Sequence, residues 1–255
     1  MYGWYTKKTP RDISWSTGTD EEIVRAIAAA DAGEIDLYND NGWRVGDTRT
    51  VSLSAMEATG TYDGVTWSVG ETHGAQDIEL VLMNKGGVTL SNGNECKFVV
   101  GMKDTLNETG YMNRTDTNSG SWDGCARRSW CNGAFRQAIP DTLRPIFKQM
   151  KTITAETHNG TTLKTSIDYF ALPAEREILG SRACSNKTEA ASTSLTQFTW
   201  YATSANRIKN NGSLWWWERS PSERTSTYFC VVTNTGATTE FDAGYTRGLS
   251  PFGCI

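Results

Sequence analysis

The side chains with the greatest chemical potential stand together at residues 214–221, which read Leu-Trp-Trp-Trp-Glu-Arg-Ser-Pro. Indole faces can bind sugar rings, and an arginine can stack on an indole or hold a carboxylate. In a strand, neighbouring side chains point to opposite faces, so Trp216 would point one way and Trp215 and Trp217 the other. The run therefore predicts a strand with one face in the core and one face that binds a ligand or is covered.

Two polar segments follow this run. Residues 222–228 (Ser-Glu-Arg-Thr-Ser-Thr-Tyr) and 242–247 (Asp-Ala-Gly-Tyr-Thr-Arg) contain the small, hydroxylated and aromatic residue types of adaptable binding loops. Rigid aromatic side chains give contact area there at a low entropic cost. Both segments are therefore candidates for ligand contact.

The residues needed for catalysis are sparse. His73 and His158 are the only histidines, no acidic or Cys partner lies at metal-ligand spacing from them, and no Gly-x-Ser-x-Gly motif occurs. A glycan hydrolase would need two carboxylates, and the sequence offers Asp168, Glu175, Glu177, Glu218, Glu240 and Asp242 without showing which of them meet. Oxygen-rich segments at 36–41 and 116–118 lack the EF-hand spacing. We expect neither an enzyme nor a metal or cofactor, and a hydrolase remains the less favoured alternative.

Composition limits the partners. The net charge is −4 over 255 residues and no basic stripe is visible, so nucleic acid is not expected. No apolar run approaches the roughly 18 residues of a membrane span, so membrane insertion is not expected either. The first residues do not resemble a secretory signal, although a signal removed earlier would also fit. The six cysteines include no Cys-x-x-Cys, which favours buried free thiols, with one or more disulfides as the alternative.

The elements that would position these groups predict an α+β fold with antiparallel strands and a few packed helices. Residues 1–18 resemble an arm, and Thr19-x-x-Glu22 is a capping box that opens a helix ending at Gly33. Further helices are predicted at 125–138, from Leu143 to Met150, and as a turn at 173–180. Strands are predicted at 43–45, 50–54, 65–67, 78–83, 97–100, 197–201, 214–217 and 228–232, with a hairpin formed by 151–157 and 161–172.

Several separate motifs resemble one uncharacterised domain family of gut phages, Firmicutes prophages and bacterial surface proteins. They are Trp216-Trp217-x-Arg219-Ser220-Pro221, the ending from Tyr245 to Ile255, and the segments 121–132, 143–148 and 168–175. The family's usual ending is Gly-Val-Arg-Pro, and Ser250 stands here in the place of the arginine. The match runs from about residue 35 to residue 255.

This resemblance implies a C-type-lectin-like fold, shared with phage diversity-generating receptor-binding proteins and formylglycine-generating enzymes. In such folds the C-terminal segment displays the binding residues. The ligand-binding residues would then be Trp215, Trp217, Glu218, Ser222, Glu223, Arg224, Thr225, Thr227, Tyr228, Asp242, Tyr245 and Thr246. Structural roles would fall to Trp216, Arg219, Pro221, Trp122 and Trp130. The calcium motifs of sugar-binding lectins and the cysteine pair of the oxidase branch are absent.

The expected function is that of a non-enzymatic phage virion module in a tail fibre, tail tip or head fibre. Residues 1–34 would attach it to other virion proteins or form a homo-oligomer, and residues 35–255 would bind a host-surface glycan or protein. It would act on the virion, outside the cell after lysis. The alternatives are a structural virion subunit whose aromatic face packs on a neighbour, and less favourably a glycan hydrolase or a formylglycine-type oxidase.

Overall fold

A five-stranded antiparallel sheet with the order β1-β4-β5-β12-β8 runs through the centre of the computed structural model, which describes residues 9–255. Its strands are β1 (Thr48–Leu53), β4 (Gln76–Lys85), β5 (Phe98–Met102), β12 (Phe252–Cys254) and β8 (Phe170–Ala171). β1 alternates buried and exposed residues, as expected of an edge strand with one face in water. Every residue of β5 and β12 is buried, so these strands form the middle of the core.

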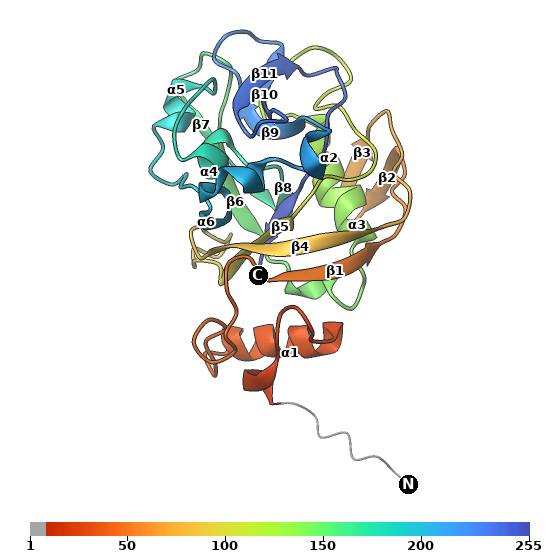
Figure 1. The fold of residues 1–255 in the computed structure, drawn as a ribbon. Helices are drawn as coiled ribbons and strands as arrows, with labels where there is room; N and C mark the ends of the chain where they lie inside the picture. The colour runs from red at the N-terminus through yellow and green to blue at the C-terminus, as the bar shows by residue number, and fades with distance from the viewer. Residues whose placement is uncertain (1–8) are drawn as a thin grey trace.

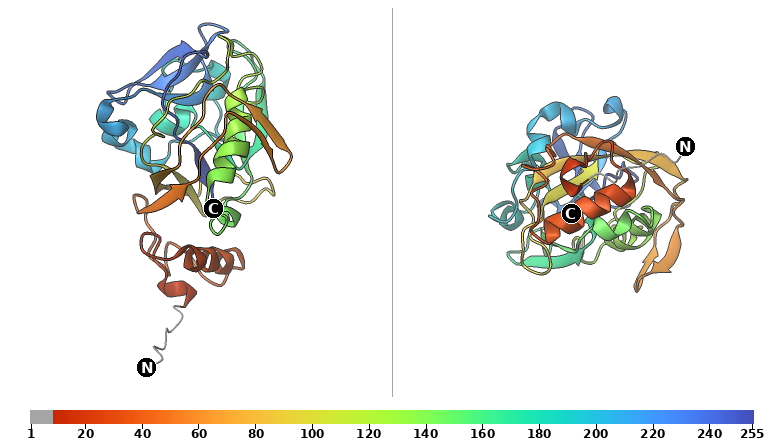
Figure 2. Two further views of the ribbon diagram at one scale, coloured as in Figure 1. Left: turned by 90° about the vertical axis from the view of Figure 1, so that its right-hand side faces the viewer. Right: turned by 90° about the horizontal axis from the view of Figure 1, so that it is seen from below.

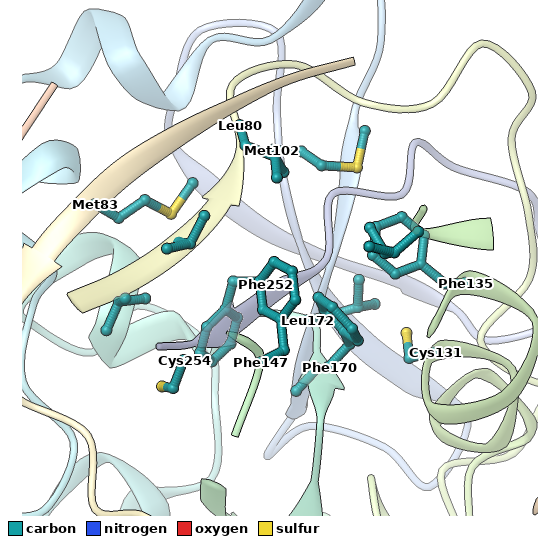
Figure 3. Close-up of a cluster of buried hydrophobic side chains, with 14 of the residues drawn as sticks. Leu80, Met83, Met102, Cys131, Phe135, Phe147, Phe170, Leu172, Phe252 and Cys254 are labelled. Carbon is teal, nitrogen blue, oxygen red and sulfur yellow. The ribbon is translucent and has the colours of Figure 1, made fainter. Parts of the chain in front are cut away.

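Aromatic side chains fill the space beside this sheet. Figure 3 shows Phe147, Phe170 and Phe252 gathered together, with Phe135 and Leu172 close to them. The ring centroids of Phe147 and Phe170 are 4.6 Å apart, and those of Phe135 and Phe170 are 5.1 Å apart in an edge-on arrangement. Such contacts add to the stabilisation that comes from burial of the rings.

The remaining strands form three smaller antiparallel sheets. β9 (Trp216–Pro221), β10 (Tyr228–Val232) and β11 (Thr238–Asp242) pair in the order β11-β10-β9, with a bulge between Phe229 and Val231. β2 (Thr59–Tyr62) and β3 (Val65–Ser68) form one hairpin, and β6 (Met150–Ala155) and β7 (Leu163–Asp168) form another. The predicted antiparallel α+β class is therefore confirmed.

The helices are short apart from α1 (Asp20–Asp31), which has the predicted capping box at Thr19 and Glu22. α2 (Ala126–Trp130) continues through the π-helical turn η2 (Cys131–Phe135) into α3 (Arg136–Ala138), close to the predicted 125–138. α4 (Glu175–Leu179) ends at Gly180, whose φ of 73° suits glycine. Single turns complete the set: η1 (Pro10–Asp12), η3 (Arg144–Ile146), α5 (Lys187–Ala190), α6 (Thr199–Ala202), η4 (Ser204–Arg207) and η5 (Asn210–Gly212).

Three predicted elements are wrong. Residues 197–201 form no strand, because Phe198 and Tyr201 are buried three positions apart, which a helical turn satisfies in α6. The helix predicted from Leu143 to Met150 stops after η3, and Met150 begins β6. Residues 43–45 are irregular, although the indole of Trp43 is buried.

Part of the predicted arm is packed on the domain. Ile13 and Trp15 are fully buried and belong to the same hydrophobic cluster as the central sheet. The Trp15 and Trp43 ring centroids are 5.3 Å apart, and Trp43 Nε1 donates to the Ile13 carbonyl. The first eight residues of the predicted arm lie outside the described part of the chain.

The sheet β9–β11 and helix α1 lie at opposite ends of the molecule (Figures 1 and 2), with the five-stranded sheet between them. Within residues 9–255, no helix combines the length and the apolar character that crossing a membrane requires.

Candidate functional site

A cleft of about 320 Å³ opens beside the start of β9 and the end of β11. This volume lies at the lower end of the range of small-ligand sites, which starts at about 300 Å³. The cleft is lined by Thr109, Ser213, Leu214, Trp215, Phe241, Thr246 and Arg247. None of these lining residues is an Asp or a Glu.

Three rings, Trp215, Phe241 and Tyr245, form the aromatic cluster: Trp215 and Phe241 line the cleft, and Tyr245 packs on Phe241 beside it. Phe241 meets Trp215 edge-on at 6.1 Å between ring centroids and meets Tyr245 edge-on at 5.1 Å. Tyr245 is 54% exposed, the highest value among the large hydrophobic side chains of the described chain, and Trp215 and Phe241 are half-buried. The rings therefore hold one another in place while leaving area open to a ligand.

Arg247 lies across the same rings. Its guanidinium carbon is 3.9 Å from the Phe241 ring centroid and 5.7 Å from that of Trp215. Among the residues that the structure describes, Arg247 forms no ion pair; its Nη1 atom donates to the Thr246 carbonyl at 2.7 Å, and its buried Nε atom has no hydrogen-bond partner. Burial lowers the pKa of this arginine, but the group stays charged at neutral pH. The cleft thus contains a cation with free donors and no protein anion.

Buried tryptophans fix the position of Trp215. Trp216 Nε1 donates to the Arg207 carbonyl at 2.9 Å, and Trp217 Nε1 donates to the Gly110 carbonyl at 2.8 Å. Gly248 N donates to the Trp215 carbonyl, and the Gly248 carbonyl accepts from Trp217 N. A Cβ at Gly248 would lie 2.7 Å from Thr105 and 3.2 Å from the Trp215 carbonyl, so only glycine allows this approach.

The two predicted binding loops are anchored from the segment around Asn118. Asn118 is 1% exposed, and its Nδ2 donates to the carbonyls of Thr225 and Tyr228. Asp116 Oδ1 accepts from Gly244 N. The amide nitrogen of Asn118 and the carboxylate of Asp116 therefore hold the two loops.

The structure separates the predicted ligand-binding residues into three groups. Trp215, Tyr245 and Thr246 border the cleft or its aromatic cluster. Partly or fully exposed side chains outside the cleft lining belong to Glu223, Arg224, Thr225, Thr227, Tyr228 and Asp242. The prediction is wrong for three residues that are fully buried: Trp217, Glu218 and Ser222. Trp217 is covered by the segment around Gly110, and Ser222 is turned inward to Glu240.

The residues predicted to be structural are all buried: Trp216, Arg219, Pro221, Trp122 and Trp130. Sequence reasoning missed Phe241, which is in the cleft, and did not assign Arg247 to the ligand. The Tyr-Thr-Arg sequence at 245–247 was a usable signal for Arg247, whereas Phe241 depended on the pairing of β10 with β11.

Most of the carboxylates that a hydrolase would need are part of the protein interior. Asp168 accepts hydrogen bonds from Trp122, Arg128, Asn132 and Thr152. Glu177 forms a bidentate, buried ion pair with Arg219, at 2.5 Å and 2.7 Å. Glu240 accepts from Ser222 and Arg224. Burial raises the pKa of Glu218 well above its usual value.

A second group of side chains, the thiol–carboxylate cluster, lies inside the protein behind β10: Glu175, Cys184, Glu218 and Cys230. Glu175, Glu218 and Cys230 are fully buried, and Cys184 is half-buried. All six cysteines of the chain are free thiols. Glu175 begins α4, Cys184 lies in the loop after it, and Glu218 and Cys230 come from β9 and β10.

The comparisons with known proteins give one match. A family model described as "Domain of unknown function (DUF6273)" matches residues 98–255. This range starts at β5 and contains both the aromatic cluster and the thiol–carboxylate cluster, while α1, β1 and β4 lie before it. No curated protein and no solved structure matches the chain.

Proposed function

Because the chain belongs to the family described as a domain of unknown function, DUF6273, whose description names no activity, we propose its function from the geometry of the cleft. The chain is a non-enzymatic recognition module that binds a carbohydrate on a host surface. The ligand contacts the aromatic cluster and Arg247. The sequence resemblance adds the setting, a phage virion, and the finer fold, which would be C-type-lectin-like.

One observation carries the proposal: an arginine without a protein anion lies over rings that are partly open to solvent. A sugar ring offers C–H groups to the faces of Trp215 and Tyr245 and hydroxyl oxygens to the free donors of Arg247. A carboxylate or phosphate on the sugar would suit Arg247 better than a hydroxyl, since charge-assisted hydrogen bonds are about twice as strong. We therefore expect an acidic glycan to bind more tightly than a neutral one.

The composition of the cleft supports binding without cleavage. Glycoside hydrolysis uses two carboxyl groups on either side of the scissile bond. The lining residues of the cleft in the described chain include no Asp or Glu. The sheet β9–β11, beside which the cleft opens, lies at the end of the molecule opposite α1 (Figure 1), and this location supports attachment to the particle through the N-terminal region.

The test is a glycan array of neutral, carboxylate-bearing and phosphate-bearing sugars, read with the native chain and with Trp215→Ala plus Tyr245→Ala. We expect the double variant to lose at least about tenfold in affinity, because such aromatic anchors contribute most of the binding energy in small sites. Leu163→Ala removes another exposed apolar side chain outside the cleft and serves as the matched control. Equal binding by all three chains contradicts the proposal.

Two other results would indicate that the aromatic cluster binds a partner other than a glycan. Binding to host cells that survives enzymatic removal of surface glycans, yet is lost in the double variant, indicates a protein ligand. Self-association of the native chain that the double variant abolishes indicates a structural subunit whose aromatic cluster packs on a neighbour.

A further inference from the structure

Three potential metal ligands converge in the thiol–carboxylate cluster. One ligand atom from each of Glu175, Cys184 and Cys230 lies within 4.8 Å of the other two. The Cys184 Sγ atom is 3.3 Å from Cys230 Sγ and 3.4 Å from Glu175 Oε1. The chain thus brings two sulfur atoms and a carboxylate oxygen into the space of one coordination sphere.

A fourth acid, Glu218 on the neighbouring strand β9, is not one of the ligand atoms that lie within 4.8 Å of one another, but one of its oxygens lacks a partner. Glu218 is fully buried, and its Oε2 atom has no hydrogen-bond partner. Its other oxygen accepts from Thr238 Oγ1 at 2.8 Å.

The strand register sets the direction of Glu218. Thr238 pairs with Val232 on β10, and Cys230 is two residues from Val232, so Thr238, Val232 and Cys230 point to the same face of the sheet. Glu218 contacts Thr238 on that face. It also follows Trp217, which pairs with Val231, and the register of β9 and β10 shifts just beyond this pair, at Cys230.

No cation of the described chain compensates this cluster. Neither Glu175 nor Glu218 forms an ion pair in the described part of the chain, and Arg219, the neighbour of Glu218, is paired with Glu177. Two buried carboxyl groups and two thiols thus lie together without a basic side chain paired to them in the described chain.

We infer that Glu175, Cys184 and Cys230 form a site for one divalent cation of borderline softness, with Zn²⁺ as the occupant and with Glu218 turning toward it as the fourth ligand. Two thiolates select Zn²⁺ over Ca²⁺ or Mg²⁺, and carboxylate oxygens complete the tetrahedron that structural zinc sites adopt. Zn–S bonds of about 2.3 Å in a tetrahedron place the sulfur atoms about 3.8 Å apart, so the thiols need to separate by only about 0.5 Å.

The surroundings of the site fit this role. Glu175 is oriented by donors from Cys184 N, Ser185 N and Ser185 Oγ, the kind of outer contacts that fix a metal ligand. Cys184 is half-buried, so an ion can enter from its side. An occupied site would tie the loop after α4 to β9 and β10, which the backbone already joins through the Ser185–Ser222 bridge.

The experiment is a Co²⁺ titration of the full, reduced chain, because Co²⁺ bound to thiolates absorbs in the near ultraviolet. We expect one equivalent to bind with a thiolate charge-transfer band and to be displaced by Zn²⁺. Uptake at neutral pH should release protons from the ligands. Cys184→Ser should abolish the band, and Glu218→Gln should weaken the affinity at least about tenfold.

Cys96→Ser is the matched control, since Cys96 is a buried thiol outside the cluster. It should bind Co²⁺ as the native chain does. Circular dichroism of every variant establishes that it is folded, and the half-buried position of Cys184 makes its serine variant the safest one. Absence of uptake by the reduced native chain overturns the inference, as does unchanged uptake by the folded Cys184→Ser variant. A Cys184–Cys230 disulfide in chain alkylated directly from its source would also overturn it.

Discussion

The aromatic cluster and the thiol–carboxylate cluster contrast in charge and in access to water. Glu240 and Phe241 are neighbours on β11 and point to opposite faces of the sheet. On the side of Phe241, Arg247 is a cation with no protein anion, and it lies at an open cleft. On the side of Glu240, Glu175 and Glu218 are acids without a protein cation, and both are sealed from water.

This contrast separates the proposed binding site from a site of internal charge. Arg247 is only half-buried, so its unpaired charge costs less than a charge that is sealed from water. Water cannot reach Glu218, and a buried charge without a partner costs several kcal/mol or is neutralised. The exposed cluster can therefore exchange ligands freely, whereas the buried cluster needs a resident proton or ion.

The largest expected effect comes from removal of a buried charge. Arg219→Met leaves Glu177 buried without its partner and should lower the free energy of unfolding by about 3–5 kcal/mol. Arg224→Met removes a side chain that is 78% exposed and should cost less than about 1 kcal/mol. Urea unfolding followed by tryptophan fluorescence measures both. Equal losses would mean that the interior around β9 is not sealed.

The next effect concerns pH. Burial raises the pKa of Glu189 from 4.5 to about 7, while Ser220 and the Ala155 amide donate to its carboxyl group. The folded chain then keeps a proton that the unfolded chain releases. This contribution to stability is complete below pH 4.5 and is lost as pH rises through about 7, by about 3 kcal/mol in total.

Glu189→Gln removes this pH dependence, since the amide is neutral at every pH. The stability of the variant relative to the native chain should therefore rise between pH 4.5 and 8, by about the same 3 kcal/mol. Urea unfolding at several pH values measures it. Parallel stability curves for the two chains would show that Glu189 titrates as an exposed acid does.

A smaller effect is expected at the anchor of the binding loops. Asn118→Ala leaves the carbonyls of Thr225 and Tyr228 without their buried donor and should cost about 2 kcal/mol. Amide hydrogen exchange should accelerate in residues 222–228 and stay unchanged in β5. Unchanged exchange in the loop would mean that Asn118 does not hold it.

The smallest effect on stability is expected at the rim of the cleft. Tyr245→Ala removes a ring that is 54% exposed and whose one described aromatic contact is with Phe241, so the cost should stay below about 1 kcal/mol. Tyr245→Ala should lower the glycan affinity by more free energy than it lowers the stability of the fold. A stability loss comparable to that of Arg219→Met would place Tyr245 in the scaffold and weaken the distinction between the clusters.

Local signals predicted much of the fold. The capping box placed α1, turn residues placed the hairpin of β6 and β7, and the strand predicted at 228–232 is β10. The strand predicted at 197–201 failed because its aromatic residues serve a helical spacing, with Tyr201 stacked near Trp216 at 5.9 Å. Short aromatic runs satisfy both periods, and only the tertiary neighbour decides between them.

The two clusters were harder to predict, because their members are also brought together by tertiary contacts that the local sequence does not contain. Period-two alternation grouped Trp217 with Trp215, but the segment around Gly110, remote in sequence, covers Trp217 and leaves Trp215 at the cleft. The bridge between Ser185 and Ser222 brings Cys184 close to Cys230, and no spacing along the chain predicts this bridge. The expectation of no metal considered only spacing along the chain, which does not detect such a tertiary contact.

The position of β12 has a consequence for the order of events during synthesis. β12 lies between β5 and β8, and Ser250 just before it donates to Met102, 148 residues earlier. During synthesis, the edge of β5 that pairs with β12 stays uncovered until residues 252–254 have been made, although the side chains of β5 are apolar. Pairing over such separations is slow, and an uncovered strand of this kind invites association with other chains. Nascent chains of this protein are therefore expected to depend on chaperones until β12 has been made.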